Sequence, residues 1–127
     1  LREIHGREEG PAPAVDLAAE KAHGDQVRAL IRNGTVTAVH DISDGGLAVA
    51  LTEMALAGGI GATIDLALDT ATAFGEDQGR YIVTAPAGVA IPGAQRIGTT
   101  GGDMVIGASL TALRTAHEGF FPALMDA

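Results

Sequence analysis

The stretch that decides the fold runs from Val39 to Met54 and reads Val-His-Asp-Ile-Ser-Asp-Gly-Gly-Leu-Ala-Val-Ala-Leu-Thr-Glu-Met. It begins as an apolar strand and ends as an amphipathic helix. Two carboxylates, a serine, a histidine and two glycines are crowded between these two parts. A strand that turns directly into a helix leaves free backbone N–H groups at the helix start. We therefore expect a strand, a tight polar turn and a helix, with a candidate ligand site at the turn.

Two interpretations of this turn fit the sequence. In the first, Ser43 or Asp44 caps the helix, and Gly45 and Gly46 only permit the tight bend. In the second, the free N–H groups bind a phosphate. Because Asp41 and Asp44 would repel a bare phosphate, this version needs a cation between them, and Mg²⁺ favours carboxylate oxygens together with substrate phosphates. The binding interpretation assigns the two aspartates to the metal and Ser43, Gly45 and Gly46 to the phosphate.

A second dense polar turn, Gly75-Glu-Asp-Gln-Gly79, precedes a strand that begins at Arg80. Gln78 and Arg80 are two residues apart, so both can project from one face of that strand. The turn fits a solvated hairpin with an incidental ion pair. It also fits a binding site, in which Gln78 and Arg80 hydrogen-bond a polar ligand while Glu76 or Asp77 joins a metal shell. Spacing alone leaves both interpretations open.

The remaining polar features favour structural roles. His40 is expected on the strand face opposite Asp41. A hydrogen-bonded core histidine is the simpler interpretation, and a general acid or base is the alternative. The run Gly98-Thr-Thr-Gly-Gly-Asp103 lacks the pattern of a P-loop and of a dinucleotide fingerprint, so a hairpin turn is expected there. No side chain is assigned a catalytic role.

Composition narrows the class of protein. The chain has 127 residues, 46% of them hydrophobic, which suits one domain with a core of aliphatic side chains. A formal net charge of −8 argues against nucleic-acid binding, which requires basic patches. The absence of cysteine excludes disulfides and thiolate sites and fits a cytoplasmic setting. No apolar run approaches the roughly 20 residues of a membrane span.

The order of predicted elements is that of a mixed β-sheet with helices packed on it, an α/β (α+β) layered sandwich. Residues 1–15 are expected to form a connector and residues 16–127 the domain, as in a piece of a longer protein. We expect helices over residues 17–32, 47–57 and 110–125, the last broken near Pro122; strands over 35–42, 62–68 and 80–85; a loop over 69–74; and a hairpin that pairs 94–97 with 104–106.

Several stretches together resemble the phosphoribosylformylglycinamidine synthase family. The two specific ones are Val39 to Ala55 and Phe74-Gly-Glu-Asp-Gln-Gly-Arg-Tyr81. Asp16 to Lys21, Ile97 to Gly102 and Leu113 to Gly119 also fit. The match is to the last domain of the large synthetase component, which belongs with the C-terminal domains of AIR synthase-related proteins. The resemblance covers nearly the whole sequence.

This resemblance implies an amidine-forming ligase of purine biosynthesis. Such enzymes use ATP, Mg²⁺ and ammonia from glutamine to convert formylglycinamide ribonucleotide through an iminophosphate. The position of Asp41 is similar to that of a Mg²⁺ ligand, and Glu76 and Gln78 match a turn that contacts substrate. The implied partners are the remaining synthetase domains, which bind most of the ATP, a glutaminase subunit and a small accessory subunit. The isolated chain is expected to be inactive.

One departure from the family is the link between residues 85 and 95. The family usually has a helix there, but Pro86 to Pro92 is too short for one of ordinary length. Two other functions also fit the sequence: a non-catalytic module that packs against sibling domains, and a domain of another AIR synthase-related, ATP-using enzyme.

Overall fold

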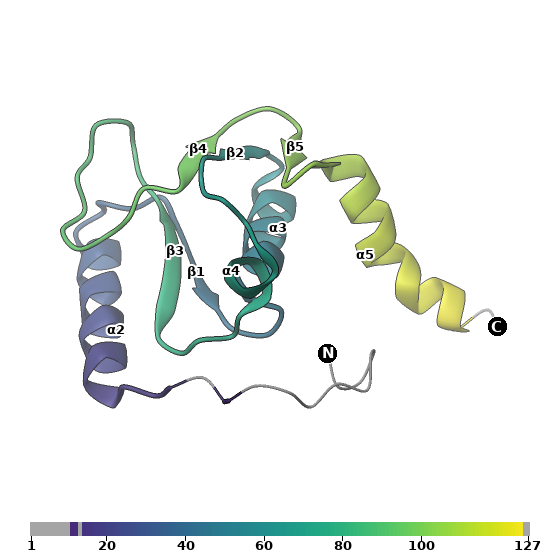
Figure 1. The fold of residues 1–127 in the computed structure, drawn as a ribbon. Helices are drawn as coiled ribbons and strands as arrows, with labels where there is room; N and C mark the ends of the chain where they lie inside the picture. The colour runs from purple at the N-terminus through teal and green to yellow at the C-terminus, as the bar shows by residue number, and fades with distance from the viewer. Residues whose placement is uncertain (1–10, 13, 126–127) are drawn as a thin grey trace.

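The computed structural model describes residues 11–12 and 14–125 (Figure 1). Most of the predicted connector, residues 1–15, lies outside the described residues. The helices are α2 (Leu17–Arg32), α3 (Gly46–Gly58), α4 (Thr70–Phe74) and α5 (Leu110–Met125). The strands are β1 (Ala38–Ile42), β2 (Ala62–Ile64), β3 (Arg80–Thr84), β4 (Gly98–Thr100), β5 (Met104–Val105) and β6 (Ala108–Ser109). This set of elements confirms the predicted α/β class.

The described strands pair as three separate antiparallel pairs: β1 with β3, β2 with β4 and β5 with β6. In the longest pair, Ala38 lies opposite Thr84 and Ile42 lies opposite Arg80. The predicted hairpin between residues 94–97 and 104–106 is wrong. β5 pairs instead with β6 across a two-residue turn at Ile106 and Gly107, whose φ angles of 43° and 82° suit a tight hairpin.

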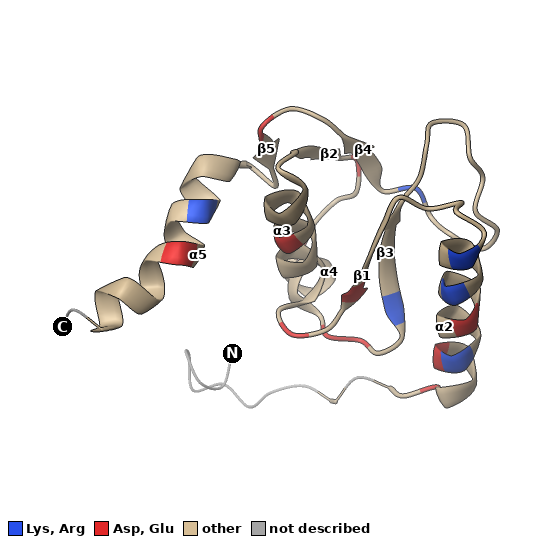
Figure 2. Cartoon of the chain, turned by 180° about the vertical axis from the view of Figure 1, so that it is seen from behind, with Lys and Arg blue, Asp and Glu red and all other residues tan. Residues whose placement is uncertain are grey.

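The core forms around α3. Its buried apolar side chains lie on α3, on β1 and β3, and on β5: Ile42, Leu47, Ala50, Leu51, Ala55, Ile82 and Val105. The helix ends where predicted, because Gly59 adopts a left-handed φ of 64° and donates its N–H to the Ala55 carbonyl. Seen from both sides, α2 and α3 flank the β1–β3 pair (Figures 1 and 2). The β1–β3 pair therefore lies between a buried helix and a surface helix.

Helix α2 confirms the prediction of one continuous helix. The Asp16 carboxylate accepts hydrogen bonds from the N–H groups of Ala18 and Ala19 at 3.0 Å, which caps the first turn. Gly24 does not interrupt the helix. It faces the Tyr81 hydroxyl of β3, which lies 3.5 Å from where a Cβ would stand. A Cβ at this position would make an ordinary van der Waals contact with that hydroxyl, so the helix meets the strand here without a clash.

Three local expectations are corrected. Residues 70–74 form α4 instead of a loop, because the Asp69 carboxylate accepts from the Thr72 N–H at 2.7 Å and caps a short helix. β2 stops at Ile64, so residues 65–68 are not part of the predicted strand. Pro122 lies inside α5, which continues to Met125. Residues 86–92 contain no helix, and no helix in the described part of the chain is both long and apolar enough to cross a membrane.

Candidate ligand site at the two polar turns

The two polar turns meet in space. The Gly45 N–H, at the start of α3, donates to the Glu76 carboxylate at 2.9 Å. Gly45 has a left-handed φ of 81°, which a glycine adopts without the strain that a Cβ would bring. Figure 2 shows acidic segments in both turns at the same end of the β1–β3 pair. A negative charge at a helix N-terminus is favourable, so Glu76 stabilises α3 as well as joining the turns.

Gly46 explains how the turns come so close. A Cβ on this residue would lie 2.7 Å from the Phe74 carbonyl carbon and 2.8 Å from its Cα, and its φ is 71°. Only glycine therefore lets the end of α4 press against the start of α3. Its own N–H donates to the Ser43 carbonyl at 3.0 Å. Gly46 thus serves the packing of α4, which in turn places Glu76.

Arg80 holds the second turn in shape. Its Nη2 donates to the Gly75 carbonyl at 2.7 Å and lies 3.6 Å from the Asp77 carboxylate. Its Nε also donates to the Asp77 carbonyl at 3.4 Å. These contacts close the loop from residue 75 to residue 80 on itself. In this structure the Arg80 guanidinium is used for the loop's own backbone, and the loop joins α4 to β3, so it is not the turn of a hairpin.

Two hollows adjoin the turns and share Ser43 and Gln78. The larger, of about 500 Å³, lies between α2 and the ends of β1 and β3, and includes Asp41 and Arg80. The smaller, of about 220 Å³, includes Asp44 and Glu76. The predicted site residues are therefore gathered in one region, but Asp41 and Asp44 line different hollows.

Charges in the larger hollow are mostly paired with one another. Lys21 and Arg28 of α2 contact the Asp25 carboxylate at 2.6 and 2.8 Å. The hydrogen bond and charge of Lys21 lower the pKa of Asp25 below its ordinary value of 3.8. The Asp41 side chain is 66% exposed, and its carboxylate lies 3.7 Å from the His40 ring. Among the carboxylates that line the larger hollow, that of Asp41 is the most exposed.

The residues fit Mg²⁺ only in part. Among residues 11–12 and 14–125, no three His, Asp or Glu side chains gather as a metal cage requires. Mg²⁺, however, usually takes one or two protein carboxylates and completes its shell with phosphates and water. Asp41 can supply one such ligand. Asp44 lines the other hollow, so the structure does not place both aspartates around one ion.

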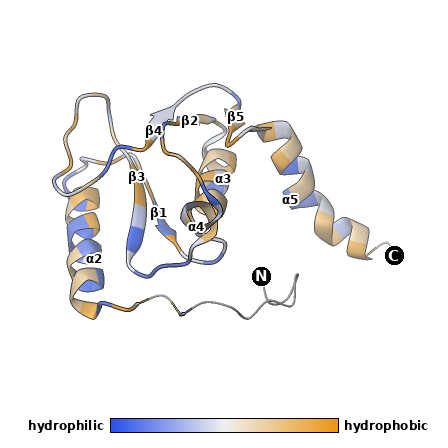
Figure 3. Cartoon of the chain, in the orientation of Figure 1, coloured by the Kyte–Doolittle hydropathy of each residue, from blue (hydrophilic) through white to orange (hydrophobic). Residues whose placement is uncertain are grey.

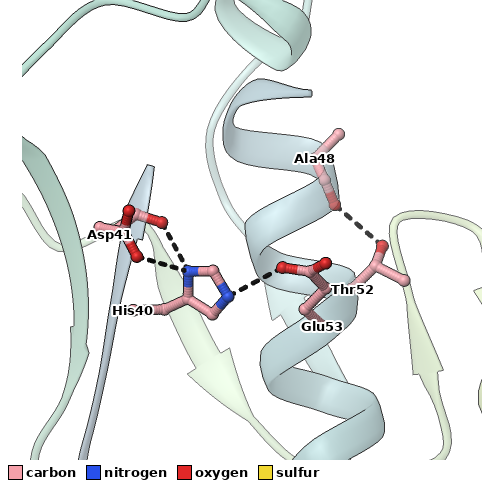
Figure 4. Close-up of polar contacts among 5 residues, drawn as sticks. All are labelled: His40, Asp41, Ala48, Thr52 and Glu53. Atoms are coloured by element: carbon pink, nitrogen blue, oxygen red, sulfur yellow. Dashed lines mark hydrogen bonds and ion pairs between the residues drawn. The ribbon is translucent and has the colours of Figure 1, made fainter. Parts of the chain in front are cut away.

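His40 joins β1 to α3 (Figure 4). Its Nε2 lies 2.9 Å from a carboxylate oxygen of Glu53, and its Nδ1 lies 2.5 Å from the Asp41 carbonyl oxygen. The side chain is 27% exposed. His40 is hydrogen-bonded, as the structural interpretation predicted, but it is partly exposed and lies outside the buried core. Its partner Glu53 comes from the helix that follows the turn.

Sequence reasoning missed the part that α2 plays. The Gly79 carbonyl lies 2.9 Å from Nδ1 of His23, and a Cβ on Gly79 would lie 2.6 Å from Cγ of Glu20. α2 therefore presses directly on the second turn and forms one wall of the larger hollow. Helical spacing places Glu20 and Gly24 on one side of α2. Spacing does not reveal which strand that side would meet.

The described geometry can be compared with known proteins. A sequence model of the family described as "AIR synthase related protein, C-terminal domain" matches residues 1–105, most of the chain and both turns. The chain belongs to this family. This match confirms the family that the two motifs predicted.

The chain is also similar to curated relatives named phosphoribosylformylglycinamidine synthase subunit PurL. It is 63% identical over 126 residues to the protein of Novosphingobium aromaticivorans, 57% over 143 residues to that of Zymomonas mobilis and 52% over 147 residues to one from Rhodopseudomonas palustris. These alignments cover 99%, 99% and 100% of the chain. They cover only 18%, 19% and 20% of the relatives. The chain thus spans about a fifth of their length.

The alignment lengths show whether a relative carries residues that this chain lacks. The Novosphingobium alignment is no longer than the part of this chain that it covers, whereas the Zymomonas alignment has 143 positions for a chain of 127 residues. The Zymomonas protein therefore carries residues that this chain lacks. The Novosphingobium relative has the same shorter length in the aligned region.

Proposed function

We propose that the chain is one domain of a phosphoribosylformylglycinamidine synthase subunit, an ATP-dependent, amidine-forming ligase of purine biosynthesis. The paired turns form part of a site for Mg²⁺ and a phosphate-bearing substrate, at a boundary with the rest of the subunit. The similarity to the three relatives supports the assignment to this enzyme. The remaining synthetase domains bind most of the ATP, a glutaminase subunit supplies ammonia from glutamine, and a small accessory subunit completes the assembly, in the cytoplasm.

The contact between Glu76 and the Gly45 N–H is the observation that carries the site proposal. It brings both motifs together and leaves Ser43 and Gln78 beside two adjoining hollows. A serine hydroxyl can donate to a phosphate oxygen, and a glutamine amide can both donate and accept. With Mg²⁺ bound, Asp41 would supply one carboxylate ligand, and the cation would offset phosphate charge.

The sharpest test replaces Asp41 by asparagine in the full-length subunit, assayed with its partner subunits. Asp41→Asn keeps the size of the side chain and removes its charge. We expect the Mg²⁺ concentration for half-maximal synthase activity to rise about tenfold, as the loss of one charge-assisted contact predicts. Asp103→Asn is the matched control, because Asp103 lies in the distant turn between β4 and β5. An unchanged Mg²⁺ requirement in Asp41→Asn would remove Asp41 from the site.

The isolated chain should not catalyse the reaction, because the proposed site is only one side of a boundary. It would be assayed with ATP, Mg²⁺, formylglycinamide ribonucleotide and ammonia. Turnover near that of a complete enzyme would contradict this part of the proposal.

A structural module is the second candidate, and one observation favours it. Glu76 and Arg80 both have partners within the chain, which leaves them less free for a ligand. Glu76→Gln in the full-length subunit separates the candidates, since glutamine can still accept from the Gly45 N–H. Unchanged binding of nucleotide, metal and substrate with unchanged turnover favours the module. Weaker substrate binding in a normally folded protein favours the site.

A further inference from the structure

The far end of α5 presents an apolar surface to solvent. Phe120, Phe121, Leu124 and Met125 are 62%, 67%, 62% and 84% exposed, and α5 buries none of its residues. The helix projects away from the other elements (Figure 1), and its far half is largely hydrophobic (Figure 3). We call these four residues the α5 apolar end. Exposed apolar clusters of this kind mark interaction sites in proteins.

The α5 apolar end continues a stripe that already packs on the domain. Leu110 and Leu113, near the helix start, lie against the core cluster. At 3.6 residues per turn, Phe120, Phe121 and Leu124 fall on the same side of the helix as these two leucines. The start of α5 is also fixed to α3, because Arg114 Nη2 donates to the Leu56 carbonyl at 2.8 Å. The first turns are thus anchored, and the stripe runs on for roughly 16 Å beyond Leu113.

The comparisons show in which proteins the sequence of α5 has a counterpart. The match to the AIR synthase-related domain ends at residue 105, before α5 begins. The alignments to the PurL relatives cover 99% to 100% of the chain, so they include α5. The helix therefore lies outside the family match but inside the PurL match. About four-fifths of each PurL relative lies outside the region aligned with this chain.

We propose that the α5 apolar end docks into an apolar groove on another part of the same polypeptide in the full-length subunit. Two phenylalanines in edge-to-face contact, with ring centroids 5.3 Å apart, form the anchor. Buried aromatic anchors dominate many interfaces. The inference rests on the proposed function only in that the chain is one domain of a longer subunit. It does not depend on the reaction.

Photo-cross-linking in the full-length subunit tests what the α5 apolar end contacts. A photoreactive phenylalanine analogue at position 121 should cross-link to a peptide of the same polypeptide that lies outside this domain. The same analogue at Thr115, on the opposite side of α5, should give no such product. Mixing isotopically light and heavy subunits separates cross-links within a chain from those between chains. A cross-link to a second copy, to another protein or to nothing overturns the proposal.

Charged substitutions give a second, independent readout. Phe120→Asp with Leu124→Asp should make the amides of α5 exchange faster in the full-length subunit, while Thr111→Asp with Thr115→Asp adds the same charge and should leave them unchanged. Equal exchange in both variants overturns the docking. Synthase activity of the full-length subunit without substitutions separates the docking proposal from the proposed function. Activity without the cross-link rejects only the docking, and the cross-link without activity rejects only the reaction.

Discussion

The Glu76 carboxylate lies 2.9 Å from the backbone nitrogen of Gly45, although 31 residues separate them in the chain. Each residue belongs to a motif that the sequence marked as a candidate ligand site. In the structure the acid of one motif occupies the helix N-terminus of the other. A ligand at these turns must therefore bind beside this contact or replace it.

Removing the Glu76 carboxylate should weaken the start of α3. In Glu76→Ala, the Gly45 N–H loses its partner, and we expect the chain to lose about 0.5–1 kcal/mol of stability, as for other helix caps at exposed positions. Glu76→Gln should lose less, because the amide oxygen still accepts. Urea unfolding and the exchange rate of the Gly45 amide measure both effects. Equal losses in the two variants would mean that charge, and not the hydrogen bond, stabilises the helix.

Gly46→Ala should be among the more damaging small changes in the chain. The added Cβ meets the Phe74 backbone at 2.7 Å in addition to the strain of a positive φ. We expect a loss of at least about 2 kcal/mol, with α4 displaced from α3. Gly34→Ala is the matched control, since Gly34 has a φ of 66° and no atom within 4 Å of a Cβ. Gly34→Ala has the backbone strain without the clash. A comparable loss of stability in Gly34→Ala would therefore argue against a steric clash at Gly46.

The cap of α4 should weaken in acid. The backbone hydrogen bond from Thr72 lowers the pKa of Asp69 below its ordinary value of 3.8. A lowered folded-state pKa gives stabilisation that is present above that ordinary value and is lost as the pH falls through the folded-state pKa. The Thr72 amide should therefore exchange faster, relative to a free peptide, below about pH 3.8. Asp69→Asn should remove this pH dependence, and its persistence would assign the effect to another group.

Arg80→Lys should loosen the second turn even though the charge is kept. Lysine cannot reproduce the planar group that reaches both the Gly75 and Asp77 carbonyls. We expect about 1 kcal/mol of lost stability and faster amide exchange across residues 75–79. Arg96→Lys is a suitable control, because the Arg96 guanidinium donates to the Thr99 hydroxyl and not to the backbone of a turn. If amide exchange is unchanged in Arg80→Lys, the contacts of the Arg80 guanidinium with the turn are dispensable, and that guanidinium is free to bind a ligand.

Sequence patterns predicted the elements with strong local signals. The Asp16 cap and the Asn33–Gly34 stop define α2, and Gly58–Gly59 ends α3. α4 was missed because five residues cannot display a helical period. The β2–β4 pairing was missed because strand alternation does not specify a partner.

The candidate site was predictable as two separate turns, and their residues lie together as the binding interpretation requires. The contact between Glu76 and Gly45 was not predictable, since it depends on α4 packing against Gly46. The wall that α2 contributes was missed for a similar reason, because Glu20 and His23 meet Gly79 only through tertiary packing. The assignment of individual side chains to metal or substrate remains a prediction.

The pairing of β1 with β3 sets the order in which this region can form during synthesis. Residue 42 pairs with residue 80, and residue 38 pairs with residue 84. The first turn is therefore synthesised before its strand partner and its capping carboxylate. At ordinary translation rates, the 38 residues from 47 to 84 take roughly 2 to 8 seconds to add. Until Glu76 has been added, the N–H of Gly45 lacks its acceptor, and until β3 has been added, β1 lacks its strand partner.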